Sequence, residues 1–177
     1  MRRIILGLVA AALVVLGSAT TAMAETGSKS DPSKDAAARI DLTKLTVKNG
    51  DKRVTFKVKV RDLRQRGSFS FHYWGGTQGT PPARSAVVSV RLKDGKPKAS
   101  YFECNTEECP KEPCQGLRAT WDQEKNIVTA SLPQRCYPRP AAHPDRPAPA
   151  VGRFFAYGSM DAIFDEMPGQ PLRLDRG

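Results

Sequence analysis

The sequence is poor in histidine, and its four cysteines all lie after residue 103. The two histidines, His72 and His143, are not accompanied by a nucleophile-elbow sequence, and no two cysteines are separated by only two residues. A hydrolase triad needs a base held beside a nucleophile, and a thiol redox site needs a close cysteine pair. These absences exclude both kinds of active site, and we predict that the protein is not an enzyme.

A long apolar run occurs only near the start of the chain, where Arg2 and Arg3 precede residues 4–16. This run is shorter than the roughly 20 residues that a spanning helix needs, and small residues follow it up to Ala24. The pattern predicts a secretory signal peptide over residues 1–24, with a signal anchor as the alternative. No cysteine stands at the predicted cleavage site, where a lipid could be attached, and no second apolar stretch follows. We therefore expect a secreted, extracellular mature chain without a transmembrane segment.

Positive charge is in excess: 28 Lys and Arg face 18 Asp and Glu, giving a formal net charge of +10. Loss of Arg2 and Arg3 with the signal peptide would leave a mature charge of +8. Such a chain is attracted to anionic polymers and phospholipid surfaces by a force that salt screens. The alternative is that the charge serves solubility alone.

Residues 25–39 are small and polar without apolar periodicity, so we predict a flexible N-terminal arm. From residue 40 the apolar residues alternate with period two, and turn residues separate the alternating runs. Hairpins are predicted at Asn49-Gly50, at Asp94-Gly95 and within residues 117–132, and a last strand over residues 152–157.

About eight short strands and no convincing amphipathic helix indicate an all-β protein. We predict a single antiparallel domain over residues 40–177, either a β-sandwich or a barrel. Residues 133–149 contain six prolines and are predicted to be an extended crossover loop between the sheets. A docking segment for an aromatic groove is the alternative for that stretch.

The four cysteines are spaced unlike a zinc site, because Cys136 has no second ligand near it. An even number of cysteines in an exported chain predicts two disulfides. Of the three possible pairings, Cys114 with Cys136 is favoured because these residues flank the hairpin within 117–132, whose ends are adjacent. Cys104 then pairs with Cys109 across a small loop.

The strand beginning at Arg53 alternates apolar residues with cations, and it predicts one positively charged strand face formed by Arg53, Lys57, Lys59 and Arg61. As a binding site, this face would suit an anionic polymer or lipid headgroups; as plain structure, it is an exposed sheet exterior whose lysines prevent edge pairing. We do not expect nucleic acid as a partner, because no aromatic residues are interleaved with these cations.

Trp74 is predicted to point outward at a strand end, where its ring could stack on a sugar. The alternative is that a neighbouring loop covers it. Carboxylate pairs suited to glycoside hydrolysis are available among two sets of acidic residues, which as plain structure are solvated loop residues. The first set is Asp161, Asp165 and Glu166, and the second is Glu103, Glu107 and Glu108.

The stretch DPSKDAAARIDLTKLTVKNGDKRVTFKVKVRDL, residues 31–63, resembles the opening of secreted bacterial β-sandwich proteins of uncharacterised function. Those proteins are remotely similar to DOMON domains and family 9 carbohydrate-binding modules. The matching positions are Asp31, Asp35 and Asp41, with Lys34 where the pattern has glycine. The resemblance implies an antiparallel β-sandwich of the jelly-roll-like kind and a binding role rather than catalysis. It also implies no cofactor beyond a structural calcium, with Asp31, Asp35 and Asp41 as that calcium's ligands.

The resulting hypothesis is an exported, non-catalytic binding or surface-interaction module for a glycan or an anionic cell-envelope polymer. The alternative is a secreted inhibitor or protein–protein interaction domain that displays the proline-rich segment and the cysteine loop to a secreted protein. A glycan hydrolase is the third hypothesis.

Overall fold

The computed structural model describes residues 24–32, 34–75, 85–105, 107–137 and 151–177. The predicted signal peptide, apart from Ala24, and residues 138–150 of the proline-rich loop lie outside these ranges. No helix of the described residues has the length and apolar content needed to cross a membrane.

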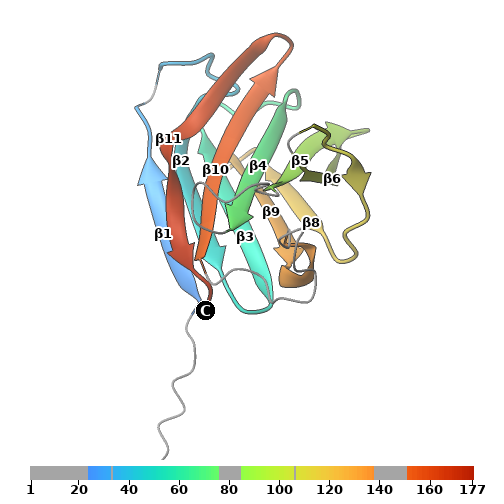
Figure 1. The fold of residues 1–177 in the computed structure, drawn as a ribbon. Helices are drawn as coiled ribbons and strands as arrows, with labels where there is room; N and C mark the ends of the chain where they lie inside the picture. Colours follow the sequence, from blue (N-terminus) through green and yellow to red (C-terminus); the bar gives the residue numbers. More distant parts are fainter. Residues whose placement is uncertain (1–23, 33, 76–84, 106, 138–150) are drawn as a thin grey trace, which may run out of the picture.

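Two antiparallel sheets pack face to face and form a sandwich (Figure 1). This confirms the predicted all-β sandwich. The five-stranded sheet has the order β1 (Glu25–Ser30), β2 (Leu42–Asn49), β3 (Arg53–Val60), β9 (Ile127–Pro133) and β8 (Arg118–Asp122). The six-stranded sheet has the order β11 (Ile163–Asp175), β10 (Val151–Met160), β4 (Ser68–Gly75), β5 (Ser85–Lys93), β6 (Lys96–Cys104) and β7 (Lys111–Glu112).

All three predicted hairpins are present, as β2–β3, β5–β6 and β8–β9. In the β5–β6 turn, Asp94 and Gly95 have φ of 54° and 70°, the left-handed pair that a tight hairpin turn requires. The β8–β9 turn likewise ends on Asn126, whose φ is 57°. Short polar residues and glycine, which accept a positive φ, therefore determine where these two turns form.

The predicted flexible arm over residues 25–39 is wrong for its first part, because residues 25–30 form strand β1. This strand pairs with β2, and it lies beside β11 in Figure 1. β1 could not be predicted from apolar alternation, because its residues are polar. An edge strand with one solvated face can be held by backbone hydrogen bonds alone. Gly27 permits the close approach, because a Cβ there would overlap the side chain of Leu174.

The predicted last strand over residues 152–157 is part of a longer hairpin made by β10 and β11. Asp161, at φ 55°, lies in the turn between the two strands. β11 contains Pro168 and Pro171, and its position at the sheet edge tolerates prolines that a central strand would not. With β1, β7 and β11 added, the described residues form eleven strands rather than about eight.

The start of the predicted proline-rich loop is regular rather than extended. Pro133 ends β9, and Gln134–Cys136 form the short 3-10 helix η1. The side-chain amide of Gln134 donates from Nε2 to Asn49 Oδ1 at 2.8 Å and to the Gly50 carbonyl at 2.7 Å, which ties η1 to the β2–β3 turn.

Phe56 is the centre of the core between the sheets. It projects from β3, is fully buried, and packs its ring against Phe71, Tyr73 and Phe154 of the opposite sheet, with centroids 5.2, 5.7 and 5.6 Å away. Successive side chains of a strand point to opposite faces, so the residues between these core positions form the two outer faces of the molecule.

Candidate binding surfaces

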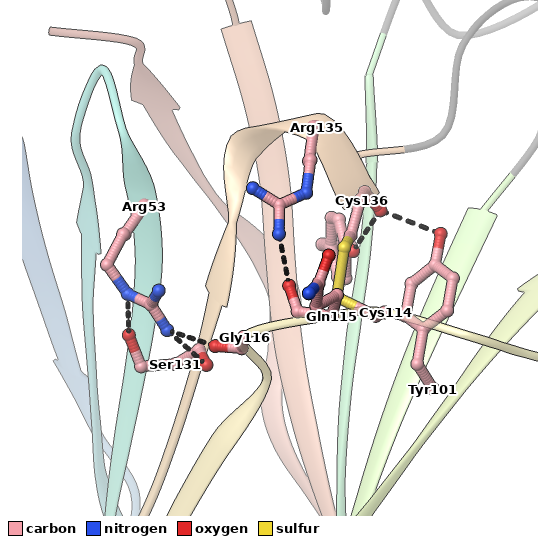
Figure 2. The surroundings of a disulfide bond; sticks show 9 residues. Arg53, Tyr101, Cys114, Gln115, Gly116, Ser131, Arg135 and Cys136 are labelled. Carbon is pink, nitrogen blue, oxygen red and sulfur yellow. Dashed lines mark hydrogen bonds between the residues drawn. A yellow bond between two sulfur atoms is a disulfide. The ribbon is translucent and has the colours of Figure 1, made fainter.

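Both predicted disulfides are present, Cys104–Cys109 and Cys114–Cys136. The second joins the ends of the β8–β9 hairpin, with 5.9 Å between Cα atoms. The Cys136 carbonyl accepts hydrogen bonds from the hydroxyls of Tyr73, at 2.8 Å, and Tyr101, at 2.7 Å. Figure 2 shows Tyr101 reaching this carbonyl beside the disulfide. These two hydrogen bonds anchor η1 to the six-stranded sheet, and the Cys114–Cys136 bridge ties η1 to the segment that precedes β8.

A hollow of about 400 Å³ lies beside this disulfide, and its lining includes Tyr101, Glu103, Glu112 and Arg135. Glu103 and Glu112 also line a smaller neighbouring hollow of about 190 Å³. The structure thus brings these two carboxylates to one concave edge.

Glu107 and Glu108, two other predicted acidic candidates, are exposed and lie in the adjoining Cys104–Cys109 loop. Their backbone amides donate to Asn105 Oδ1, at 2.8 and 2.7 Å. These bonds shape the loop and involve neither carboxylate.

An aromatic surface covers the outer side of β4 and β10. His72 stacks on Phe155 with centroids 4.8 Å apart and meets Tyr157 edge-on, also at 4.8 Å. Trp74 packs edge-on against Phe155 at 5.1 Å. All four side chains are partly exposed. We call this surface the aromatic face; its residues are His72, Trp74, Phe155 and Tyr157.

Trp74 points outward, as the sequence predicted, and the cross-strand register explains its neighbours. Phe155 lies directly opposite His72, and Tyr157 opposite Ser70. Sequence reasoning identified Trp74 alone, because β4 and β10 are about eighty residues apart and their pairing leaves no local sign. The alternation of Phe155 and Tyr157 along β10 could have indicated that both rings lie on one face of that strand.

Packing among the rings changes the titration of two side chains. Burial lowers the pKa of His72 to about 4, so its imidazole is neutral at physiological pH. Burial, followed by the charge and hydrogen bond of Glu166, raises the pKa of the Tyr157 hydroxyl. The aromatic face is therefore neutral at its centre, with the Glu166 carboxylate at its β11 side.

A positively charged surface covers the outer side of the five-stranded sheet. Lys44 of β2 lies directly opposite Lys59 of β3, and Lys48 lies opposite Thr55. Lys44, Lys48, Lys57 and Lys59 are exposed, and none of these four forms an ion pair within the part of the chain that the structure describes. We call this surface the basic face; its cations are Lys44, Lys48, Arg53, Lys57, Lys59 and Arg118.

Arg53 is held rigidly at the margin of the basic face. Its guanidinium donates to Ser131 Oγ at 3.0 Å, to the Ser131 carbonyl at 2.8 Å and to the Gly116 carbonyl at 2.9 Å (Figure 2). Burial, with the charges of Arg118 and Arg135, lowers its pKa. Three arginines thus converge where β3, β8 and η1 meet.

Arg61, predicted to continue the charged strand face, has a different position. Its Nε lies 2.7 Å from Asp41 Oδ2, and it donates to the Ala36 carbonyl at 2.9 Å. Asp41 is fully buried and also accepts a 2.7 Å hydrogen bond from the Lys34 amide. β3 ends at Val60, so Arg61 turns toward the segment that precedes β2. Arg61 and Asp41 stabilise this segment rather than face a ligand.

Three carboxylates lie close together beside that segment. Asp31, Asp35 and Asp165 each bring one oxygen within 4.8 Å of the others. Burial is the main cause that raises the pKa of Asp31 and of Asp165, and the neighbouring carboxylates add to it. Hard oxygen ligands suit calcium, so these residues fit the ion that the resemblance implied, with Asp165 joining Asp31 and Asp35 where Asp41 was expected.

The predicted hydrolytic set of Asp161, Asp165 and Glu166 is not brought to one place. Asp161 lies in the β10–β11 turn, and Asp165 is buried with its Oδ2 accepting from the Leu42 amide at 2.6 Å. Glu166 contacts Tyr157 on the outer side of the same sheet. Adjacent residues of one strand point to opposite faces, which separates Asp165 from Glu166.

Comparisons with known proteins identify no family. A scan against protein-family models finds no match, and searches of the curated proteins and of the solved structures find none either. The resemblance to DOMON domains and family 9 carbohydrate-binding modules stays a prediction.

Proposed function

We propose that the protein is an exported, non-catalytic module that binds a glycan on its aromatic face. The observation that carries the proposal is the ring cluster of Trp74, Phe155, His72 and Tyr157 on the solvent side of β4 and β10. These rings lie on the outer side of the sheet, away from the core between the sheets, and each is partly exposed. Clustered apolar side chains at the surface are typical of an interaction site.

The chemistry around the rings favours a carbohydrate. Sugars present apolar C–H faces together with hydroxyls, so they need flat rings with hydrogen-bonding groups beside them. Trp74 and Phe155 supply the rings. Ser70 and Ser85 lie in the neighbouring register positions of β4 and β5, and Glu166 lies beside Tyr157. The neutral imidazole of His72 adds a polar edge without a charge that would have to be desolvated.

A binding assay on glycans tests the proposal. Purified protein is incubated with a panel of insoluble polysaccharides and with a glycan array, and the bound fraction is measured. Trp74→Ala and Phe155→Ala should each weaken binding at least tenfold, because each removes a stacking surface. Phe164→Ala is the control, since Phe164 is 70% exposed near the start of β11 and is not one of the four rings that pack together.

Two outcomes oppose the proposal. Binding that falls equally in Phe164→Ala would indicate adhesion through any exposed ring. Retention of the wild-type affinity in the Trp74→Ala, Phe155→Ala double variant, with the variant folded by circular dichroism, would remove the aromatic face from the binding site.

A further inference from the structure

The basic face differs from an ordinary charged exterior in its two-dimensional layout. Its cations come from β2, β3 and β8, which span about 14 Å across four neighbouring strands at the usual strand spacing. Along β3, Arg53 and Lys59 are about 20 Å apart. The charges therefore occupy a plane rather than a line.

The lysines of this plane are placed at a cost to the folded state. Lys44 and Lys59 are directly opposite on paired strands, an arrangement that is destabilising for like charges. Asp122, at the end of β8, is paired with Lys125 at 2.9 Å rather than with a lysine of the basic face. An anionic partner would relieve this repulsion, whereas water and salt only screen it.

The other outward residues of the basic face are mostly hydroxyl-bearing. Thr46 and Thr129 lie on either side of Lys57, and Ser131 lies between Thr55 and Arg118. Hydroxyls donate hydrogen bonds to phosphate oxygens. The outward positions of β2, β3 and β9 carry no aromatic ring in the described register, so a stacking platform for nucleic-acid bases or sugar rings is missing there.

We propose that the basic face docks the protein on the surface of a lipid bilayer rich in anionic phospholipid. A planar array of phosphates matches a planar array of cations, whereas a single linear polyanion would meet only one row of them. Each lysine or arginine near such a surface contributes about 1 kcal/mol. Because the basic face and the aromatic face are the two opposite outer surfaces of the sandwich, a docked molecule directs its aromatic face away from the membrane.

Vesicle sedimentation tests this inference independently of glycan binding. The partition coefficient of the protein is measured on vesicles of neutral phosphatidylcholine alone and on vesicles containing 30 mol% phosphatidylglycerol, at several salt concentrations. We expect binding only to the anionic vesicles, falling steeply with salt. Lys57→Gln, Lys59→Gln should weaken it about 30-fold.

The matched control is Lys93→Gln, Lys96→Gln, which removes the same charge from exposed positions at the β5–β6 turn of the other sheet. It should change the partition less than threefold. Equal weakening by both double variants would overturn the inference, because net charge alone would then explain binding. So would equal partition onto neutral vesicles, or salt-sensitive binding to a soluble anionic polysaccharide with no binding to anionic vesicles.

Discussion

The packing of His72 among the rings of the aromatic face predicts a specific acid sensitivity. His72 contacts Phe155 and Tyr157, and burial lowers its pKa to about 4. In the unfolded chain the pKa of a histidine is about 6.5. The unfolded state therefore binds a proton at a higher pH than the folded state does. The stability that comes from burying a neutral His72 is fully present above pH 6.5 and is lost as the pH falls toward 4.

The size of the effect follows from these two pKa values. Between pH 7.5 and pH 5, protonation of the unfolded state should remove about 2 kcal/mol from the free energy of unfolding. Below pH 4 both states are protonated, and no further loss comes from this residue. The Glu166 carboxylate on the same face is hydrogen-bonded to Tyr157.

The assay compares wild type with His72→Phe, which keeps a ring at the position and removes the titrating group. Urea unfolding is measured at pH 7.5 and at pH 5, and all other titrating groups, including His143, are common to both proteins. The stability difference between them should shift by about 2 kcal/mol in favour of the variant at pH 5. A difference that is the same at both pH values would refute the reasoning and show that the imidazole is solvated.

Further predictions concern the disulfide, the core and the segment before β2. Cys114→Ser, Cys136→Ser should lower the free energy of unfolding by roughly 3 kcal/mol in denaturant titrations, and an unchanged midpoint would contradict the anchoring of η1. Phe56→Ala should cost about 3 to 5 kcal/mol in the same assay, since it leaves a cavity between the sheets, and a loss under 1 kcal/mol would contradict its central position. Arg61→Ala should cost about 3 to 5 kcal/mol because it leaves a buried carboxylate unpaired, and binding to anionic vesicles should be unaffected. A calcium ion held by Asp31, Asp35 and Asp165 would stabilise wild type by about 2.7 kcal/mol at one hundred times its Kd, but would not stabilise Asp165→Asn, which keeps an acceptor for the Leu42 amide. Equal stabilisation of the two proteins, or none, would oppose the carboxylate site.

The sequence predicted those parts of the fold that depend on neighbouring residues. Asp94 and Gly95 accept the positive φ of a tight turn, so the β5–β6 hairpin was visible locally. Cys114 and Cys136 flank another hairpin, and the adjacency of its ends was enough to predict their disulfide. The predicted alternation of apolar residues with cations along β3 is present in the structure, where Phe56 is buried and Lys57 is exposed.

The features that were missed arise from contacts between distant segments. β1 is polar and is recognisable only through its pairing with β2 and its proximity to β11. Asp165 joins Asp31 and Asp35 through tertiary packing, which no spacing in the sequence reveals. Arg61 was predicted to face outward by extending the alternation beyond the end of β3. In the structure it is instead paired with the buried carboxylate of Asp41.

The central claim, that the aromatic face binds a glycan, is tested most directly by the fluorescence of Trp74. The chain has two tryptophans, and Trp121 packs on Phe69 in the core with its indole nitrogen unpaired among the described residues. In a Trp121→Phe protein, Trp74 is therefore the only indole reporter. Titration with a soluble oligosaccharide of the polysaccharide that binds best should shift and saturate its emission, with the same Kd that a calorimetric titration gives. Calorimetric binding without any change in Trp74 emission would contradict the claim.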